Sequence, residues 1–162
     1  MDQLAALSIA EDLRRLKAQY CRAVDTRDLP LLNSIIAPEI LWDERGAATD
    51  PVTGVNLSPE VTDIVIRRAS NVINAVQSAL KGITSSVHHV YMPEIDIIDH
   101  NHARATWAMY DNVRFSEGLI SEMTGYGYYH ETYQRFGGPW KISSLKVTRL
   151  RLEMIRRGVS AR

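Results

Sequence analysis

The sequence "SVHHVYMPEIDII" (residues 86–98) alternates apolar and polar side chains and is the first of four segments that decide the fold. The other three are "ARATWAMYDNVRF" (103–115), "GYGYYHETYQRF" (125–136) and "WKISSLKVTRLRLEM" (140–154). A period of two residues is typical of a strand with one buried face. Because "DHNH" joins the first two segments and "GGP" joins the last two, the pattern predicts two hairpins of long antiparallel strands.

The first 28 residues predict an amphipathic helix instead. In "EDLRRLKAQYCRAVDTRD" (11–28) the apolar side chains recur with a period of 3.6 residues. Ser8 and Glu11 have the spacing of a capping box, so we expect the helix to begin there. Cys21, the single cysteine, falls among apolar residues of this helix and cannot form an internal disulfide. We expect an inert core thiol rather than a nucleophile.

Three further elements are predicted before the long strands. Asp28 is placed to cap a short helix over residues 29–37, with Pro30 in its first turn. The segment "PEILWDERG" (38–46) alternates and predicts a strand, and the glycine- and proline-rich loop after it leads to a longer helix over residues 59–82. Helices followed by antiparallel strands predict an α+β domain, in which a curved sheet wraps around about three helices.

Composition limits the kind of protein. A chain of 162 residues suits one domain, and we expect residues 153–162 to form a frayed tail. Lys plus Arg and Asp plus Glu both number 19, and five histidines do not change this balance, so neither nucleic acid nor a membrane surface is expected as a partner. The sequence has no signal-peptide pattern at its start and no long apolar run, which together with the lone cysteine predicts a cytoplasmic protein.

The order of elements and several local motifs resemble the SnoaL-like branch of the nuclear transport factor 2 superfamily. The motifs are "LKAQYCRAVDTRD", "APEILWD", "HHVYMPEIDI", "ATWAMYD" and "YHETYQRFGGPWKISSLKVTRLRL", and the resemblance extends over residues 8–152. This branch contains bile acid 7α-dehydratase, hexachlorocyclohexane dehydrochlorinase and scytalone dehydratase. The resemblance implies a cone-shaped fold with a cavity, although the superfamily also holds cyclases, isomerases and non-catalytic binding proteins.

The resemblance implies that His88 is a catalytic base and that Asp25 orients and charges it. An imidazole titrates near neutral pH, and a carboxylate on its other nitrogen fixes the tautomer. Strand alternation alone places one of His88 and His89 inside the cone, and the resemblance selects His88, with His89 as the alternative. Asp25 lies off the apolar stripe of its helix, where a solvated turn residue is the competing interpretation.

The resemblance also implies substrate contacts. Tyr20, five residues before Asp25, is expected to donate a hydrogen bond to a substrate carbonyl, with a core tyrosine as the alternative. Asp111 and Arg149 fall on pocket positions of the family, and Arg149 could hold a carboxylate or a phenolate, or lie exposed on its strand. Where the bile acid enzyme has a pocket tyrosine, this chain has Glu44 beside Trp42, so its substrate contacts must differ.

Further predicted substrate contacts are Trp42 and three members of an aromatic and apolar wall, Tyr128, His130 and Met109. Core packing or a subunit interface is the alternative for each of them. No histidine spacing indicates a metal site and no phosphate-binding loop is present, so neither a metal nor a cofactor is expected.

These observations predict a cofactor-independent lyase or isomerase, most simply a dehydratase, that acts on a hydrophobic cyclic small molecule with a carbonyl group. Two alternatives stay open: a polyketide or terpenoid cyclase that uses the same cavity, and a non-catalytic binding or assembly module of the same fold. Apolar residues on the outer side of the strands predict a homo-oligomer, either a dimer or a trimer.

Overall fold

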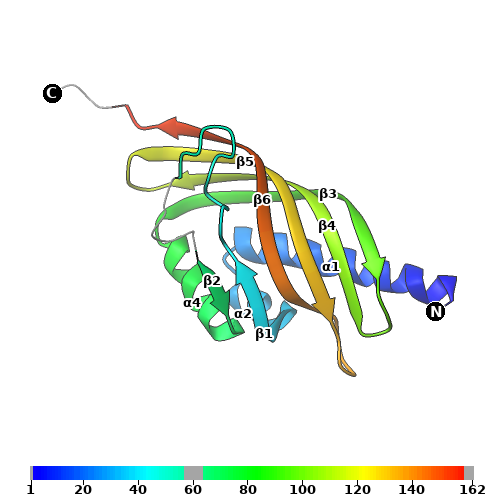
Figure 1. Cartoon of the computed structure of the whole chain (residues 1–162). Helices are drawn as coiled ribbons and strands as arrows, with labels where there is room; N and C mark the ends of the chain where they lie inside the picture. Colours follow the sequence, from blue (N-terminus) through cyan, green and yellow to red (C-terminus); the bar gives the residue numbers. More distant parts are fainter. Residues whose placement is uncertain (1, 57–63, 159–162) are drawn as a thin grey trace.

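The computed structural model describes residues 2–56 and 64–158, which form helices packed on one six-stranded sheet. In chain order the elements are α1 (Gln3–Asp25), α2 (Leu29–Ile35), β1 (Ile36–Asp43), β2 (Val65–Arg67), α4 (Ala69–Leu80), β3 (Ile83–Ile97), β4 (His102–Phe115), β5 (Ile120–Gln134) and β6 (Lys141–Arg156). The sheet order is β2-β1-β6-β5-β4-β3, and only β1 and β6 are parallel among these described strands. Figure 1 shows the long strands bending around the helices, so the predicted α+β cone is confirmed.

Both predicted hairpins are present, and the register of the first shifts near Pro93. β3 pairs with β4 and β5 pairs with β6, and β4 also pairs with β5. The register of β3 against β4 shifts between Val90 and Pro93, because proline has no N–H to donate to the ladder. β6 continues to Arg156, so the predicted tail at 153–162 begins later than expected, and residues 159–162 lie outside the described residues.

The start of α1 corrects one prediction. The helix begins at Gln3, and the carboxylate of Asp2 caps it by accepting a hydrogen bond of 2.7 Å from the backbone N–H of Ala5. Ser8 and Glu11 therefore lie inside the helix, and the predicted capping box is wrong. Aspartate is a strong N-cap by itself, and no helix-breaking residue separates it from the apolar repeat.

The second helix begins as predicted and ends slightly earlier. The carboxylate of Asp28 accepts a hydrogen bond of 2.9 Å from the backbone N–H of Leu31, so the predicted cap is confirmed. The helix ends at Ile35, and β1 starts at Ile36, which places Pro38 within the strand.

The third predicted helix, over residues 59–82, is wrong in its first part. Val65–Arg67 form strand β2, which pairs with β1, and α4 covers only Ala69–Leu80. Arg68 has a φ of +74°, which interrupts any helix at that point. Tertiary pairing has overridden the local helical period. Residues 59–63 of the prediction lie outside the described residues.

The core lies between α1 and the inner face of the sheet. Leu13, Leu16 and Tyr20 of α1 are buried in one cluster with Trp107 and Tyr129 of the strands. Cys21 is buried at the edge of the same cluster, and burial raises the pKa of its thiol to about 11. The thiol is therefore protonated at neutral pH, as expected of a core cysteine. No helix among the described residues has the length and apolar character needed to span a lipid bilayer.

Candidate active site

A cavity of about 220 Å³ lies between the helices and the inner face of the sheet. Most of its wall is apolar and consists of Val24, Trp42, Ala47, Ala48, Val76, Ala79, Leu80, Ile83, Val113, Met123, Leu145 and Val147. The remaining lining residues are Tyr20, Glu44, Ser86, His88, Asp111, Tyr129 and Arg149. An apolar hollow with a few converging polar groups is the usual form of a small-molecule site.

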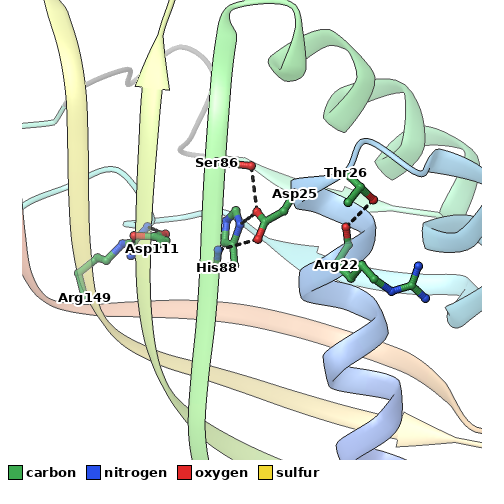
Figure 2. A network of polar contacts seen from close by, with 7 residues as sticks. All are labelled: Arg22, Asp25, Thr26, Ser86, His88, Asp111 and Arg149. Atoms are coloured by element: carbon green, nitrogen blue, oxygen red, sulfur yellow. Dashed lines mark hydrogen bonds and ion pairs between the residues drawn. The ribbon is translucent and has the colours of Figure 1, made fainter.

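Asp25 and His88 meet at the wall of this cavity. The carboxylate of Asp25 lies 2.6 Å from Nδ1 of the His88 ring and accepts a hydrogen bond of 2.8 Å from the backbone N–H of His88. The Ser86 hydroxyl donates a third hydrogen bond, of 2.9 Å, to the same carboxylate. Figure 2 shows the three side chains pointing toward one another between the end of α1 and β3. The structure thus brings together His88, the predicted base, and Asp25, its predicted partner.

The end of α1 is fixed so that Asp25 reaches β3. Asp25 is the last residue of the helix, and Thr26 closes it with a hydroxyl hydrogen bond of 2.7 Å to the carbonyl of Arg22. Arg27 then adopts a φ of +60°, and its guanidinium donates to the carbonyl of Ile83 at the start of β3. A carboxylate at a helix C-terminus is opposed by the helix dipole, and the hydrogen bonds from β3 offset this cost.

These hydrogen bonds also set the charge of the pair. Burial by itself would raise the pKa of Asp25, but hydrogen bonds from the ring and backbone of His88 and from Ser86 outweigh it and hold the pKa below its ordinary value. Asp25 is therefore a carboxylate at neutral pH. Because a carboxylate can only accept, Nδ1 of His88 carries a proton, and in the neutral ring the lone pair is therefore on Nε2. The side chains are 12% and 22% exposed for His88 and Asp25, so the pair is not sealed in the core.

Tyr20 and Trp42 both line the cavity. The Tyr20 ring contacts the Trp42 ring with centroids 5.9 Å apart, and the Tyr129 ring at 5.8 Å. Burial raises the pKa of Tyr20 well above 10, and the same is true of Tyr129. Tyr20 is therefore a neutral phenol that can donate a hydrogen bond.

Asp111 and Arg149 also line the cavity, but they bind each other. The guanidinium makes two hydrogen bonds to the carboxylate, of 2.9 and 2.8 Å, and its Nε donates to the carbonyl of Ala47 at 2.7 Å. A Cβ on Gly125 would lie 2.2 Å from atoms of both side chains, so only glycine leaves room for this pair. All three nitrogens of Arg149 are engaged, so its charge is paired within the protein, and its role in holding a substrate stays a prediction.

Four other predicted contacts do not line the cavity. His89 pairs with Tyr110 of β4, and Tyr110 pairs with Tyr126 of β5, so these residues lie on the outer face of the sheet. Tyr128 and His130 follow Tyr126 at two-residue intervals and share this face; His130 lines a separate groove there, of about 530 Å³. These three are corrections that follow from strand alternation.

The fourth is Met109, which is buried in the core on the inner face. Its sulfur lies 3.4 Å from a guanidinium nitrogen of Arg149. Met109 therefore contacts the ion pair and does not line the cavity.

Three polar residues of the cavity were not predicted as site residues from the sequence: Tyr129, Ser86 and Glu44. Ser86 stands two residues before His88, so alternation along β3 could have placed it on the same face. Glu44 stands two residues after Trp42, and the Trp42 indole N–H donates to its carboxyl group. Burial raises the pKa of Glu44 to about 7, Arg149 opposes this, and Asp43 and Asp111 reinforce it.

No group of three or more His, Cys, Asp or Glu side chains within residues 2–56 and 64–158 is arranged to hold a metal ion.

Residues 5–146 match the family model of the SnoaL-like domain. The chain belongs to the SnoaL-like family. Among curated proteins, this SnoaL-like chain is 25% identical to the probable cyclase FGR4 of Gibberella zeae over 142 residues, which are 85% of this chain and 89% of that protein.

Solved structures share the SnoaL-like fold at low sequence identity. A type 2 hexachlorocyclohexane dehydrochlorinase (LinA) superposes with a TM-score of 0.76 and 15% identity, covering 95% of this chain and 93% of that one. A candidate scytalone dehydratase from Novosphingobium aromaticivorans superposes with a TM-score of 0.77 and 12% identity, covering 99% of both chains. These likenesses confirm the cone fold.

Proposed function

We propose that this SnoaL-like protein is a lyase that dehydrates a hydrophobic, cyclic, carbonyl-bearing small molecule by acid–base chemistry of its own side chains. The observation that carries the proposal is the His88 ring at the cavity wall, with Nδ1 held by the ionised Asp25. This arrangement prepares one ring nitrogen, Nε2, to accept a proton.

In the proposed reaction His88 removes a proton from the carbon beside the substrate carbonyl. The ring becomes an imidazolium, and the adjacent Asp25 carboxylate stabilises the new charge without taking the proton. A positioned base of this kind contributes roughly 10²–10⁴-fold in rate. Tyr20 donates a hydrogen bond to the carbonyl oxygen as negative charge develops on it. A neutral phenol suits this task, because it can donate while an ionised one cannot.

The lining of the cavity supports a small, uncharged substrate. Arg149 is paired with Asp111, so it is not free to hold an anionic group. The apolar wall favours a hydrophobic molecule. The volume of about 220 Å³ is below the range of roughly 300–1,000 Å³ typical of drug-sized ligands, which favours one or two rings over a steroid.

The comparisons support an elimination and also a second candidate. Two proteins of the same fold carry the names of eliminating enzymes, a dehydrochlorinase and a dehydratase. The sequence relative FGR4 is named as a probable cyclase, which favours ring closure as the second candidate. In a cyclase, His88 would remove the same kind of proton, and the resulting carbanion would form a carbon–carbon bond instead of expelling water. The products distinguish the two reactions.

The proposal is tested with 3-hydroxycyclohexanone in D₂O. We expect the wild-type protein to exchange the protons beside the carbonyl for deuterium, measured by ¹H NMR, and to release cyclohexenone, measured by absorbance. His88→Ala and Asp25→Asn should slow both processes by roughly 100-fold or more. His89→Ala is the matched control, since it removes a neighbouring imidazole from the outer face and should change neither rate. Full activity in both His88→Ala and Asp25→Asn would refute the proposal.

A further inference from the structure

A second acid–base group, Glu44, lines the same cavity from a segment near the other edge of the sheet. Glu44 directly follows β1, whereas His88 belongs to β3, and β6, β5 and β4 separate these strands in the sheet. The backbone of Glu44 is held on both sides, since its N–H donates to the carbonyl of Ile64 and its carbonyl accepts from the N–H of Ala47, each at 3.0 Å. These bonds fix the backbone from which the Glu44 side chain reaches the cavity wall.

The surroundings of this carboxyl group disfavour a negative charge. One oxygen accepts the Trp42 indole N–H, and the other has no hydrogen-bond partner among the described residues. Arg149, the nearby cation, is bound by Asp111. Asp43, from the same segment, adds a second carboxylate. Hydrogen bonds from Arg45 lower the pKa of Asp43 to about 2, and burial opposes this only in part.

Ionisable groups reach the cavity from most of its walls. They are Tyr20 from α1, His88 from β3, Asp111 from β4, Tyr129 from β5 and Arg149 from β6, while α4 contributes only Val76, Ala79 and Leu80. Both phenols are neutral at physiological pH. The net effect on Glu44 is that burial, reinforced by Asp43 and Asp111, raises its pKa to about 7, so a large fraction of the group is protonated near neutral pH.

Glu44 and Asp25, the carboxyl partner of the cavity-lining His88, are therefore in opposite states. Asp25 has three hydrogen-bond donors and is ionised. Glu44 has one donor and is poised to carry a proton. Environments that push the pKa values of two groups apart are the usual means by which one site runs acid and base steps together.

We propose that Glu44 is the general acid that protonates the departing hydroxyl group during the dehydration. This inference rests on the proposed function, because it assigns a second catalytic residue to that reaction. In the step, His88 takes the proton from carbon and the C–H electron pair forms the carbon–carbon double bond. The C–O bond breaks, its electron pair goes to oxygen, and the oxygen takes the proton of Glu44 and leaves as water.

The products are an enone, water, an imidazolium at His88 and a carboxylate at Glu44. The proton that His88 has gained and the proton that Glu44 has lost are balanced, so one proton transfer through solvent restores the starting state. A neutral carboxylic acid meets this requirement and a permanent carboxylate does not.

The experiment compares two leaving groups in Glu44→Gln and in the wild type. 3-Hydroxycyclohexanone needs a proton on its leaving oxygen, whereas 3-chlorocyclohexanone releases chloride without one. We expect Glu44→Gln to lose roughly 100-fold or more in dehydration and less than about tenfold in chloride release. Deuterium exchange beside the carbonyl should persist in this variant, which also shows that it is folded. Glu39→Gln, the same change at an exposed position of β1, is the control and should match the wild type.

The pH profile supplies a readout that a structural role would not move. Wild-type dehydration should decline as the pH rises through about 7, because Glu44 loses its proton there, and Glu44→Gln should lack this decline. Equal losses on both probes, or unchanged dehydration, would overturn the inference. Failure of the proposed function looks different: His88→Ala would keep deuterium exchange, or the wild type would act on neither probe.

Discussion

Two acid–base pairs connect α1 to the sheet, and only one of them faces the cavity. Asp25 with His88 lies at the C-terminal end of the helix, and Lys17 with Glu131 lies two turns earlier. Both pairs join a side chain of α1 to a side chain of a long strand. Only the first pair includes a residue that lines the cavity.

The second pair is closed on all sides. Lys17 and Glu131 have 0% exposed side chains and are 2.5 Å apart. Tyr133 donates to the other oxygen of Glu131, and the Trp107 indole donates to Tyr133 at 2.8 Å. The Lys17 ammonium also lies 3.4 Å from the centroid of the Tyr129 ring. Since these groups satisfy one another, the network stabilises a particular packing and has no group left to offer a ligand. Both pairs are hydrogen-bonded, so the feature that distinguishes Asp25–His88 from Lys17–Glu131 is its access to the cavity.

The largest expected effect on stability comes from breaking the closed pair. Glu131→Gln leaves Lys17 as an uncompensated buried charge, which should lower the free energy of unfolding by about 3–5 kcal/mol at pH 7. Burial lowers the pKa of Lys17, with Glu131 opposing this, so the folded state binds fewer protons than the unfolded state just below the ordinary lysine pKa of 10.5. The loss in the variant should therefore shrink as the pH rises toward that value. Urea unfolding of the wild type and of Glu131→Gln at several pH values measures this difference in the free energy of unfolding.

Two further variants sharpen this test. Adding Lys17→Met to Glu131→Gln removes the stranded charge and should recover part of the loss. Glu153→Gln removes an exposed partner of Arg151 and should change stability by less than about 1 kcal/mol. A double variant no more stable than Glu131→Gln would contradict the account of the closed pair.

A smaller effect is expected at the open pair. Ser86→Ala removes one of the three hydrogen bonds to Asp25, so the pKa of Asp25 should rise toward its ordinary value. A hydrogen bond to a charged group contributes at least about 1.5 kcal/mol. Its loss corresponds to roughly a tenfold slower deuterium exchange, which is a much smaller effect than the one expected for His88→Ala. ¹³C NMR titration of Asp25 and the exchange rate measure the two effects. Ser85→Ala, at the adjacent exposed position, should leave both unchanged.

Local patterns predicted most of the fold, and long-range pairing explains what they missed. The two-residue period of the four long segments gave β3 to β6 and their hairpins, because each strand buries one face. The parallel contact between β1 and β6 joins residues about a hundred positions apart and has no local signal. The same is true of β2, where Ile66 pairs with Trp42 although its own segment has a helical period.

The candidate site follows the same division. Alternation and the family resemblance together placed His88 and Asp25, whereas alternation alone left His88 and His89 equivalent. The pairing of Asp111 with Arg149 depends on a gap over Gly125 that only the three-dimensional register creates. Glu44 lies beyond the end of its strand, and its protonation depends on neighbours from other strands. These relations could not be predicted from residue spacing.

The central claim is that Asp25 fixes the His88 ring with Nδ1 protonated and Nε2 free to accept a proton. ¹⁵N NMR of the histidine ring nitrogens tests this without a substrate. The account predicts that neutral His88 in the wild type carries its proton on Nδ1, that Asp25→Asn abolishes this preference, and that His89 is the same in both proteins. A proton on Nε2 in the wild type, or an unchanged tautomer in Asp25→Asn, would contradict it.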